Sequence, residues 1–195
     1  MIGEISKKAT RKLIKNQIIG EEDFDLYNYG LFILISEILL FVYCLSVGAV
    51  LNNILPSVLF YMFFSLVHRF SGGFHAKTEL HCMIITLSFF LISIILIKLS
   101  TQLNCITLIA FYGCCSIILI ILSPVDTPQK PLSNKEKILF KKITSLIIVV
   151  GFIVIVALFV KNIYLYANAI VIAVFLQTLS IICGRFFNKR LLTNK

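Results

Sequence analysis

A short polar stretch between two long apolar runs gathers the side chains best suited to catalysis. Residues 68–82 contain all three histidines of the chain, together with Cys82, the one cysteine outside the apolar runs. A thiol becomes a good nucleophile once an imidazole accepts its proton, and a nearby cation such as Arg69 favours the thiolate. Gly72 and Gly73 allow tight backbone geometry, so their N–H groups could donate to a developing oxyanion. These residue types indicate cysteine-dependent chemistry on a peptide.

Spacing restricts which histidine could serve Cys82. On one straight helix, His75 and Cys82 would share a face but lie about 10.5 Å apart along the axis. That separation is too long for a hydrogen bond, so such a pair requires a bend or a loop between the two residues. His81 would point about 100° away from Cys82 on a helix. His68 ends the preceding apolar run and could face Cys82 across the helix pair.

Two other interpretations apply to the same residues. A lone cysteine near a membrane face is more often a packing residue than a nucleophile. Alternatively, His68, His75, His81 and Cys82 could supply four zinc ligands. Their spacings match no usual zinc pattern, and the chain contains no His-Glu-x-x-His sequence. We therefore predict neither a metal nor another cofactor.

The composition is that of a membrane protein. Hydrophobic residues make up 59% of the 195 residues, whereas ordinary soluble domains have about 45–50%. The other five cysteines lie inside apolar runs, where cysteine acts as a small hydrophobe, so a secreted disulfide framework is not expected. Residues 1–16 carry five basic residues and no apolar core before a cleavage site, and therefore do not resemble a signal peptide.

Six apolar runs define the expected architecture. A helix needs about 20 apolar residues to cross a bilayer core of about 30 Å, and helices satisfy all backbone groups in lipid. The sequence therefore predicts an all-α integral membrane protein with six transmembrane helices in a single membrane domain over residues 1–195. The second and third runs are short, so we expect both helices to extend into the polar stretch between them. The predicted spans are approximately 31–51, 54–68, 83–97, 105–122, 143–160 and 163–183.

The basic residues predict the orientation. All but two of the 18 lysines and arginines fall on one side of a six-span arrangement; the exceptions are Lys98 and Lys161. Connections rich in basic residues stay in the cytoplasm. Both termini and the His/Cys stretch are therefore expected at the cytoplasmic face. The net charge of +9 is mostly this topological signal, and nucleic-acid binding is not predicted.

Residues 1–30 precede the first span. Apolar residues recur there at near-helical spacing with lysines between them, which predicts an amphipathic helix on the inner leaflet. A solvated cytoplasmic arm is the other interpretation, since the apolar stripe is modest. The acidic cluster of residues 21–25 then forms either a turn or a surface for a basic peptide. The stripe consists of Ile2, Ile5, Ala9, Leu13 and Ile18.

The connection between the fourth and fifth spans contains three prolines within residues 124–131. Proline restricts its own φ and the conformation of the residue before it. This predicts a stiff, extended loop rather than a helix. Ser133 and Glu136 then have the spacing of a capping box, which predicts that the next helix begins there.

Together, the two polar motifs resemble a known family. The sequence Arg-x-x-Gly-Gly-x-His-Ala at residues 69–76, followed by Cys82, is similar to that of the accessory gene regulator protein B (AgrB) family of bacterial membrane endopeptidases. The sequence Pro-x-Asp-Thr-Pro-x-Lys-Pro at residues 124–131 is similar as well. The length, the basic N-terminal segment and the six spans agree, so the resemblance covers essentially the whole chain.

The resemblance implies a specific reaction. Such proteins cut a small membrane-associated propeptide of the AgrD type in the cytoplasm of a bacterial cell. They convert it to a cyclic thiolactone or lactone used as a quorum-sensing signal. The family's catalytic residues fall on His75, as general base, and Cys82, which would carry an acyl-thioester. The resemblance also implies a homodimer in the cell membrane.

For some other residues, a role is expected from the chemistry of the side chain and not from the resemblance. Arg69 could hold the oxyanion or a substrate carboxylate, and Lys130 could contact an acidic propeptide tail; contact with lipid headgroups is the alternative. A third catalytic residue stays open between Glu79, close in sequence, and Asp126, which could be close in space.

A small transporter or exporter without peptidase chemistry is the rival hypothesis. It would explain the spans and Glu37, the one acidic residue inside them, since intramembrane carboxylates are often functional. A protonated or hydrogen-bonded group at a helix contact is the other interpretation of Glu37. The six short spans show no visible inverted repeat of the kind transporters contain. A transporter would tolerate Cys82→Ser, whereas a cysteine peptidase would not.

Overall fold

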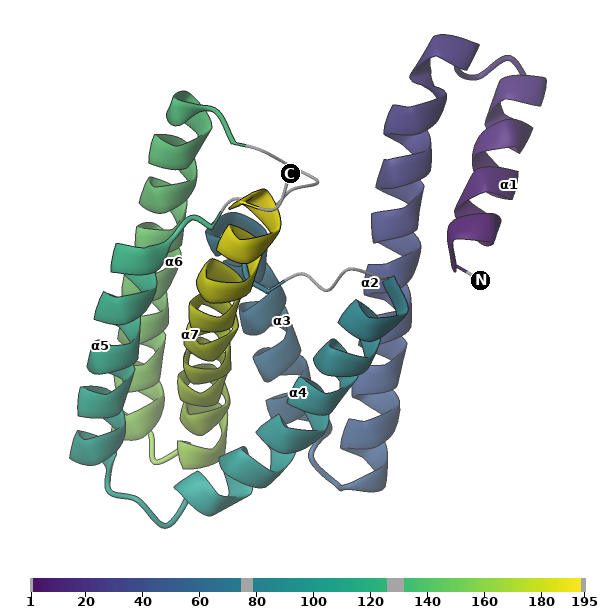
Figure 1. Ribbon diagram of the computed structural model, residues 1–195. Helices are drawn as coiled ribbons and strands as arrows, with labels where there is room; N and C mark the ends of the chain where they lie inside the picture. The colour runs from purple at the N-terminus through teal and green to yellow at the C-terminus, as the bar shows by residue number, and fades with distance from the viewer. Residues whose placement is uncertain (1, 75–78, 126–131, 194–195) are drawn as a thin grey trace. The chain divides into compact units, whose positions relative to one another are not determined.

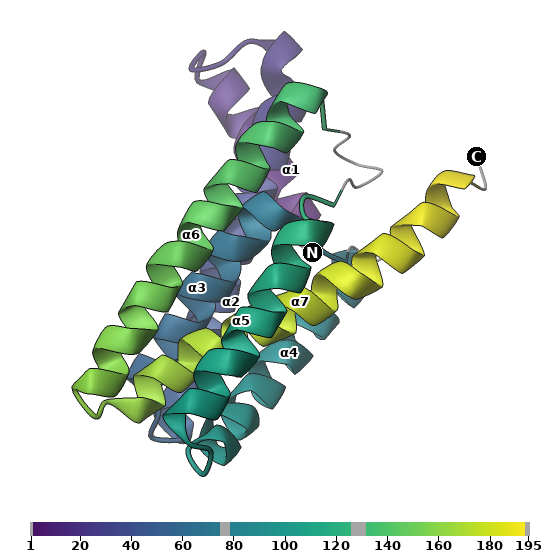
Figure 2. The ribbon, with the colours of Figure 1, turned by 90° about the vertical axis from the view of Figure 1, so that its left-hand side faces the viewer.

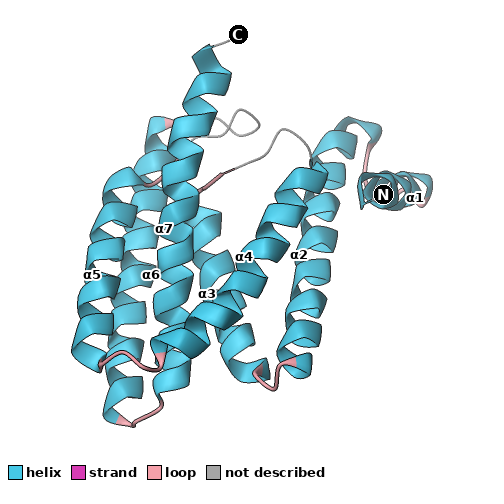
Figure 3. Cartoon of the chain, turned by 60° about the horizontal axis from the view of Figure 1, so that its bottom comes forward, coloured by secondary structure: helices cyan, strands magenta, loops and turns pink. Residues whose placement is uncertain are grey.

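The computed structural model describes residues 2–74, 79–125 and 132–193, without the side chains of residues 79, 80, 82 and 187–193. Within these ranges the chain is helical apart from short connections, as Figure 3 shows. A 3-10 turn, η1 (Glu21–Asp23), precedes the second helix. The α-helices are α1 (Ile2–Lys15), α2 (Phe24–Val50), α3 (Ile54–Ser71), α4 (Glu79–Ser100), α5 (Cys105–Leu122), α6 (Asn134–Val160) and α7 (Tyr164–Thr193).

Six of the described helices, α2 to α7, are long and apolar enough to cross a membrane, and α1 is an additional helix before them. The predicted fold class is therefore confirmed, and the protein is a multi-pass membrane protein. Both helices beside the polar stretch extend into it, as their short apolar runs predicted. α3 continues to Ser71, and α4 begins at Glu79.

The chain forms two compact units, of which the first, Met1–Ser46, contains α1, η1 and most of α2. A side-chain hydrogen bond joins α1 to α2. Ser6 and Thr10 are buried, and the Ser6 hydroxyl donates a hydrogen bond of 2.9 Å to Asn28 Oδ1. Ile5, on the apolar stripe, stays 47% exposed. The predicted N-terminal helix is thus confirmed, and the acidic cluster lies in η1 and the first turn of α2.

The second unit, Val47–Lys195, is organised around α7. α7 contacts α3, α4, α5 and α6 (Figures 1 and 2), and most residues of its membrane span are buried. Small residues such as Ala167, Ala169 and Ala173, all fully buried, let neighbouring helices approach closely. Polar residues on α7 can therefore reach the backbone of segments far away in the sequence.

Hydrogen bonds reinforce this packing. The Tyr112 hydroxyl on α5 donates to the carbonyl of Ile148 on α6 at 2.8 Å. The Thr178 hydroxyl on α7 lies 3.2 Å from the Cys115 carbonyl on α5. In a bundle surrounded by lipid, such contacts and close packing hold helices together, because apolar burial alone gives little preference for protein over lipid.

The connection between α5 and α6 agrees with its sequence at both described ends. α5 ends at Leu122, and the residues up to Val125 are not helical. The Ser133 hydroxyl accepts from the Glu136 N–H at 3.3 Å, and the Glu136 carboxylate accepts from the Ser133 N–H at 2.8 Å. The predicted capping box is confirmed. Residues 126–131, with most of the proline motif, lie outside the described ranges.

Candidate active site

The end of α3 and the residues after it form the described part of the candidate site. The Gly72 N–H donates to the carbonyl of His68 at 3.0 Å and closes the helix. Gly72 has a φ of 70°, in the left-handed region that favours glycine. A Cβ at this position would lie 2.5 Å from the carbonyl oxygen of Val125. Conformation and space both require glycine here. We refer to residues 72–74 as the double-glycine segment.

Gln177 of α7 binds the beginning of this segment. Its side chain is fully buried. The amide Nε2 donates to the carbonyl of Gly72 at 2.6 Å and to the hydroxyl of Ser71 at 2.8 Å. The amide Oε1 lies 3.1 Å from His68 Nδ1. A single buried side chain thus contacts three residues of the motif across more than 100 positions of sequence.

Two further residues of α7 lie along the same segment. The Ser180 hydroxyl accepts a hydrogen bond from the Phe74 N–H at 3.2 Å. A Cβ on Gly184 would lie 2.6 Å from the backbone carbon and oxygen of Gly73, so only glycine leaves room for the chain. With Gln177, these residues have spacings of three and four, which place them on one face of the helix. α7 therefore provides a continuous support for residues 72–74.

The second motif begins at the same place. The Val125 N–H, after the end of α5, donates to the carbonyl of Ser71 at 2.9 Å. The last described residue of this connection therefore lies beside the start of the double-glycine segment. Two motifs separated by about fifty residues in the sequence therefore converge in the fold.

His68 lies in the last turn of α3. Its ring stacks on Phe64, with centroids 5.7 Å apart and an interplanar angle of 14°. Gln177 Nε2 is a donor in both of its contacts, so Gln177 Oε1 is the acceptor toward His68. The His68 Nδ1 must then carry the proton, which leaves Nε2 with the lone pair in the neutral ring. Gln177 thereby determines the tautomer of His68.

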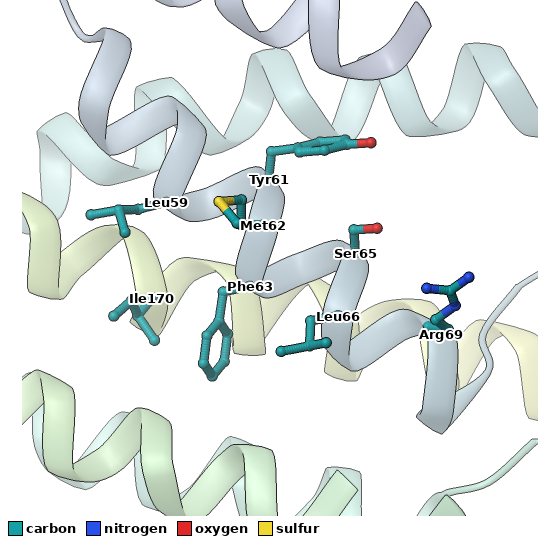
Figure 4. A pocket seen from close by; sticks show the side chains of 8 residues that line it. All are labelled: Leu59, Tyr61, Met62, Phe63, Ser65, Leu66, Arg69 and Ile170. Carbon is teal, nitrogen blue, oxygen red and sulfur yellow. The ribbon is translucent and has the colours of Figure 1, made fainter. Parts of the chain in front are cut away.

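Arg69 lies at the end of an apolar groove along α3. The groove has a volume of about 430 Å³, and Figure 4 shows Arg69 at one end of its lining residues, away from Leu59 at the other. Arg69 is exposed, whereas the remaining lining is largely apolar. A cation beside such a groove can hold an acidic group whose attached chain is apolar. The lining residues are Leu59, Tyr61, Met62, Phe63, Ser65, Leu66, Arg69 and Ile170.

The proposed catalytic pair is only partly described. Cys82 is the fourth residue of α4, and its side chain lies outside the described atoms. His75, Asp126 and Lys130 lie outside the described residues. Residues 72–74, which precede His75, are not helical, and Cys82 lies on α4. Of the zinc candidates, His81 is exposed, and the described residues contain no cluster of three metal-binding side chains.

Sequence reasoning missed the contribution of α7. Gln177, Ser180 and Gly184 lie around the end of the last apolar run, more than 90 residues after the motif. The available signal was Gln177 itself, since an amide inside a membrane span is costly unless it is hydrogen-bonded. The presence of this amide indicates that it has a polar partner but does not show which residue the partner is.

Fold and site together define a class: a multi-pass helical membrane protein with a polar, glycine-rich site at the end of its helices. The accessory gene regulator B family matches residues 6–181. The chain belongs to this AgrB family. AgrB proteins are peptidases, and membership implies processing of an AgrD propeptide in quorum sensing.

Individual relatives share about a quarter of the aligned residues with this chain. A protein described as AgrB-like from Clostridium perfringens strain 13 is 27% identical over 143 residues, covering 70% of this chain and 67% of the relative. Another from Clostridium beijerinckii is 27% identical over 180 residues, covering 90% of this chain and 87% of the relative. No solved structure matches the chain.

Proposed function

We propose that this protein cleaves an AgrD-type propeptide with Cys82 as nucleophile and His75 as general base. The Cys82 Sγ forms a bond to the scissile carbonyl carbon, on the C-terminal side of the future ring. As the C–N bond breaks, the thiol proton passes through His75 to the leaving amine. The C-terminal fragment departs, and an acyl-thioester remains on Cys82.

Ring closure follows without loss of the activated acyl group. A thiol of the propeptide attacks the thioester, a new thioester closes the ring, and Cys82 leaves as a thiolate that regains its proton. With a propeptide hydroxyl as nucleophile, the same step gives a lactone. Hydrolysis would dissipate the activation, so the site must keep water from the intermediate, which a position at the membrane edge favours.

The convergence of the two family motifs supports this proposal most directly. Val125 is hydrogen-bonded to Ser71, and the double-glycine segment continues toward His75. Cys82 lies on α4, the next described helix after the double-glycine segment. Covalent catalysis needs a base within hydrogen-bond reach of the nucleophile, and this is the arrangement that we propose for His75 and Cys82.

Supporting roles follow from the same geometry. The Gly72 N–H is already bound to the His68 carbonyl, so we assign the oxyanion contact to the N–H of Gly73. Arg69 would bind an acidic group of the propeptide, with apolar propeptide side chains in the groove along α3. Lys130 would contact an acidic propeptide tail, and Asp126 or Glu79 would orient His75.

An acyl-enzyme is the result that tests the reaction. A synthetic AgrD-type propeptide is incubated with the purified protein in lipid vesicles, and intact mass is measured. We expect a thiol-labile adduct of the N-terminal propeptide fragment on the wild type and none on Cys82→Ala. Cleavage that persists in Cys82→Ala would overturn the cysteine mechanism. A propeptide neither bound nor cleaved would favour the transporter hypothesis.

The orientation makes a separate prediction. With the termini and the site in the cytoplasm, Lys161 faces the outside and Lys135 the inside; both are exposed. A membrane-impermeant maleimide applied to intact cells should therefore label Lys161→Cys and leave Lys135→Cys at the background of the wild type. Labelling of Lys135→Cys alone would reverse the orientation. The homodimer is part of the same proposal, and cross-linking in the membrane measures it.

A further inference from the structure

We propose that Gln177 is a positioning residue of the peptidase site, which holds the double-glycine segment in the conformation that presents His75 to Cys82. This inference rests on the proposed function, since it assumes that His75 and Cys82 react as a pair. Gln177 lies on α7, outside both sequence motifs, and its role is visible only from its contacts.

The first step is the orientation of the amide. Nε2 has two hydrogens, and they point to the Ser71 hydroxyl at 2.8 Å and the Gly72 carbonyl at 2.6 Å. Oε1 then faces His68 Nδ1 at 3.1 Å. Flipping the amide would place its oxygen against the Gly72 carbonyl, which is itself an acceptor. The side chain therefore has one satisfied orientation.

The second step is burial. Gln177 has no exposed surface, and an amide without partners in an apolar interior is unfavourable. Its three partners all belong to the end of α3 and the double-glycine segment. Moving that segment would leave a buried donor or acceptor unpaired, so Gln177 restrains the segment more strongly than a surface contact would.

The third step is the short distance along the chain to the catalytic base. One residue after Gly72, Gly73 passes against Gly184, and the Phe74 N–H is bound to Ser180. Phe74 is the residue immediately before His75. α7 thus holds the backbone up to Phe74, the residue before the base. A displacement of about 1 Å at a reacting group can cost about a hundredfold in rate.

Replacing Gln177 by methionine tests the inference, because methionine keeps the length of the side chain and removes the hydrogen bonds. Single-turnover acylation of Cys82 by the propeptide is measured in vesicles at several propeptide concentrations. We expect the maximal rate to fall about 10- to 100-fold, while the concentration for half-saturation changes by less than about threefold. A general loss of structure would not lower the maximal rate while leaving the concentration for half-saturation unchanged.

Asn168→Leu is the matched control. Asn168 is also a fully buried amide on α7, and its side-chain atoms have no hydrogen-bond partner among the described residues. Its replacement should leave the acylation rate near that of the wild type. Should Gln177→Met fail to fold, Gln177→Asn decides the question, because the shorter amide cannot reach all three partners; we expect at least a tenfold lower maximal rate.

The outcomes separate the two proposals. If wild type forms no adduct on Cys82, the proposed reaction fails, whatever Gln177 does. If wild type forms the adduct and a folded Gln177 variant forms it at the same maximal rate, the positioning role is overturned and the reaction stands. A change only in the propeptide concentration for half-saturation would also overturn the positioning role, because that result would assign Gln177 to propeptide binding.

Discussion

Cys82→Ala is expected to abolish release of the C-terminal propeptide fragment, and His75→Ala to slow it by about 10²- to 10⁴-fold. Without the thiol no covalent intermediate forms, whereas without the imidazole the small thiolate fraction at neutral pH still reacts slowly. The measurement is the single-turnover rate of fragment release in vesicles, by mass spectrometry. Both variants must reach the membrane in amounts equal to the wild type.

His81→Ala is the control for this pair. His81 neighbours Cys82 on α4 and is exposed, so the cysteine mechanism predicts a rate near that of the wild type. A zinc site built from the histidines predicts loss of activity in this variant and in the presence of a chelator. The same experiment thus distinguishes the nucleophile from the metal interpretation of the motif.

Gly184→Ala is expected to reduce the acylation rate by about a hundredfold or more. The added Cβ would lie 2.6 Å from the backbone carbon and oxygen of Gly73 and 2.9 Å from the Phe74 nitrogen. These are backbone atoms, so no rotamer change relieves the contact, and the double-glycine segment must move away from α7. Since Phe74 directly precedes His75, the base moves with it, and misplacement by about 1 Å costs about that factor.

Gly113→Ala is the matched control for Gly184→Ala. Gly113 is also a helical glycine of the second unit, but a Cβ there meets no atom within 4 Å. Alanine is the better helix former by about 1 kcal/mol, so this variant should keep its activity and its stability in detergent. Equal rates for Gly184→Ala and Gly113→Ala would contradict the close approach of α7 to the segment.

The features that could be predicted from sequence are those that depend on neighbouring residues. The spans follow from apolar runs long enough to cross a bilayer, and the capping box at Ser133 follows from the residue three positions later. Gly72 was expected to allow a tight turn, and its φ of 70° agrees. The hydrogen bond from the Gly72 N–H to the His68 carbonyl could not be predicted, because it depends on where α3 ends. This bond uses the N–H that was expected to contact an oxyanion.

The sequence by itself determined the membrane class, the helical fold and the residues whose chemistry suits a cysteine peptidase. These properties are local, since each span must satisfy its own backbone in lipid, and a thiol near imidazoles is visible in one short stretch. Only the tertiary structure decided that Gln177, Ser180 and Gly184 support the double-glycine segment, and that Val125 brings the second motif to it. The physical reason is that a buried amide requires partners but does not specify them. The packing of α7 among α3, α4, α5 and α6 selects them from residues about one hundred positions away.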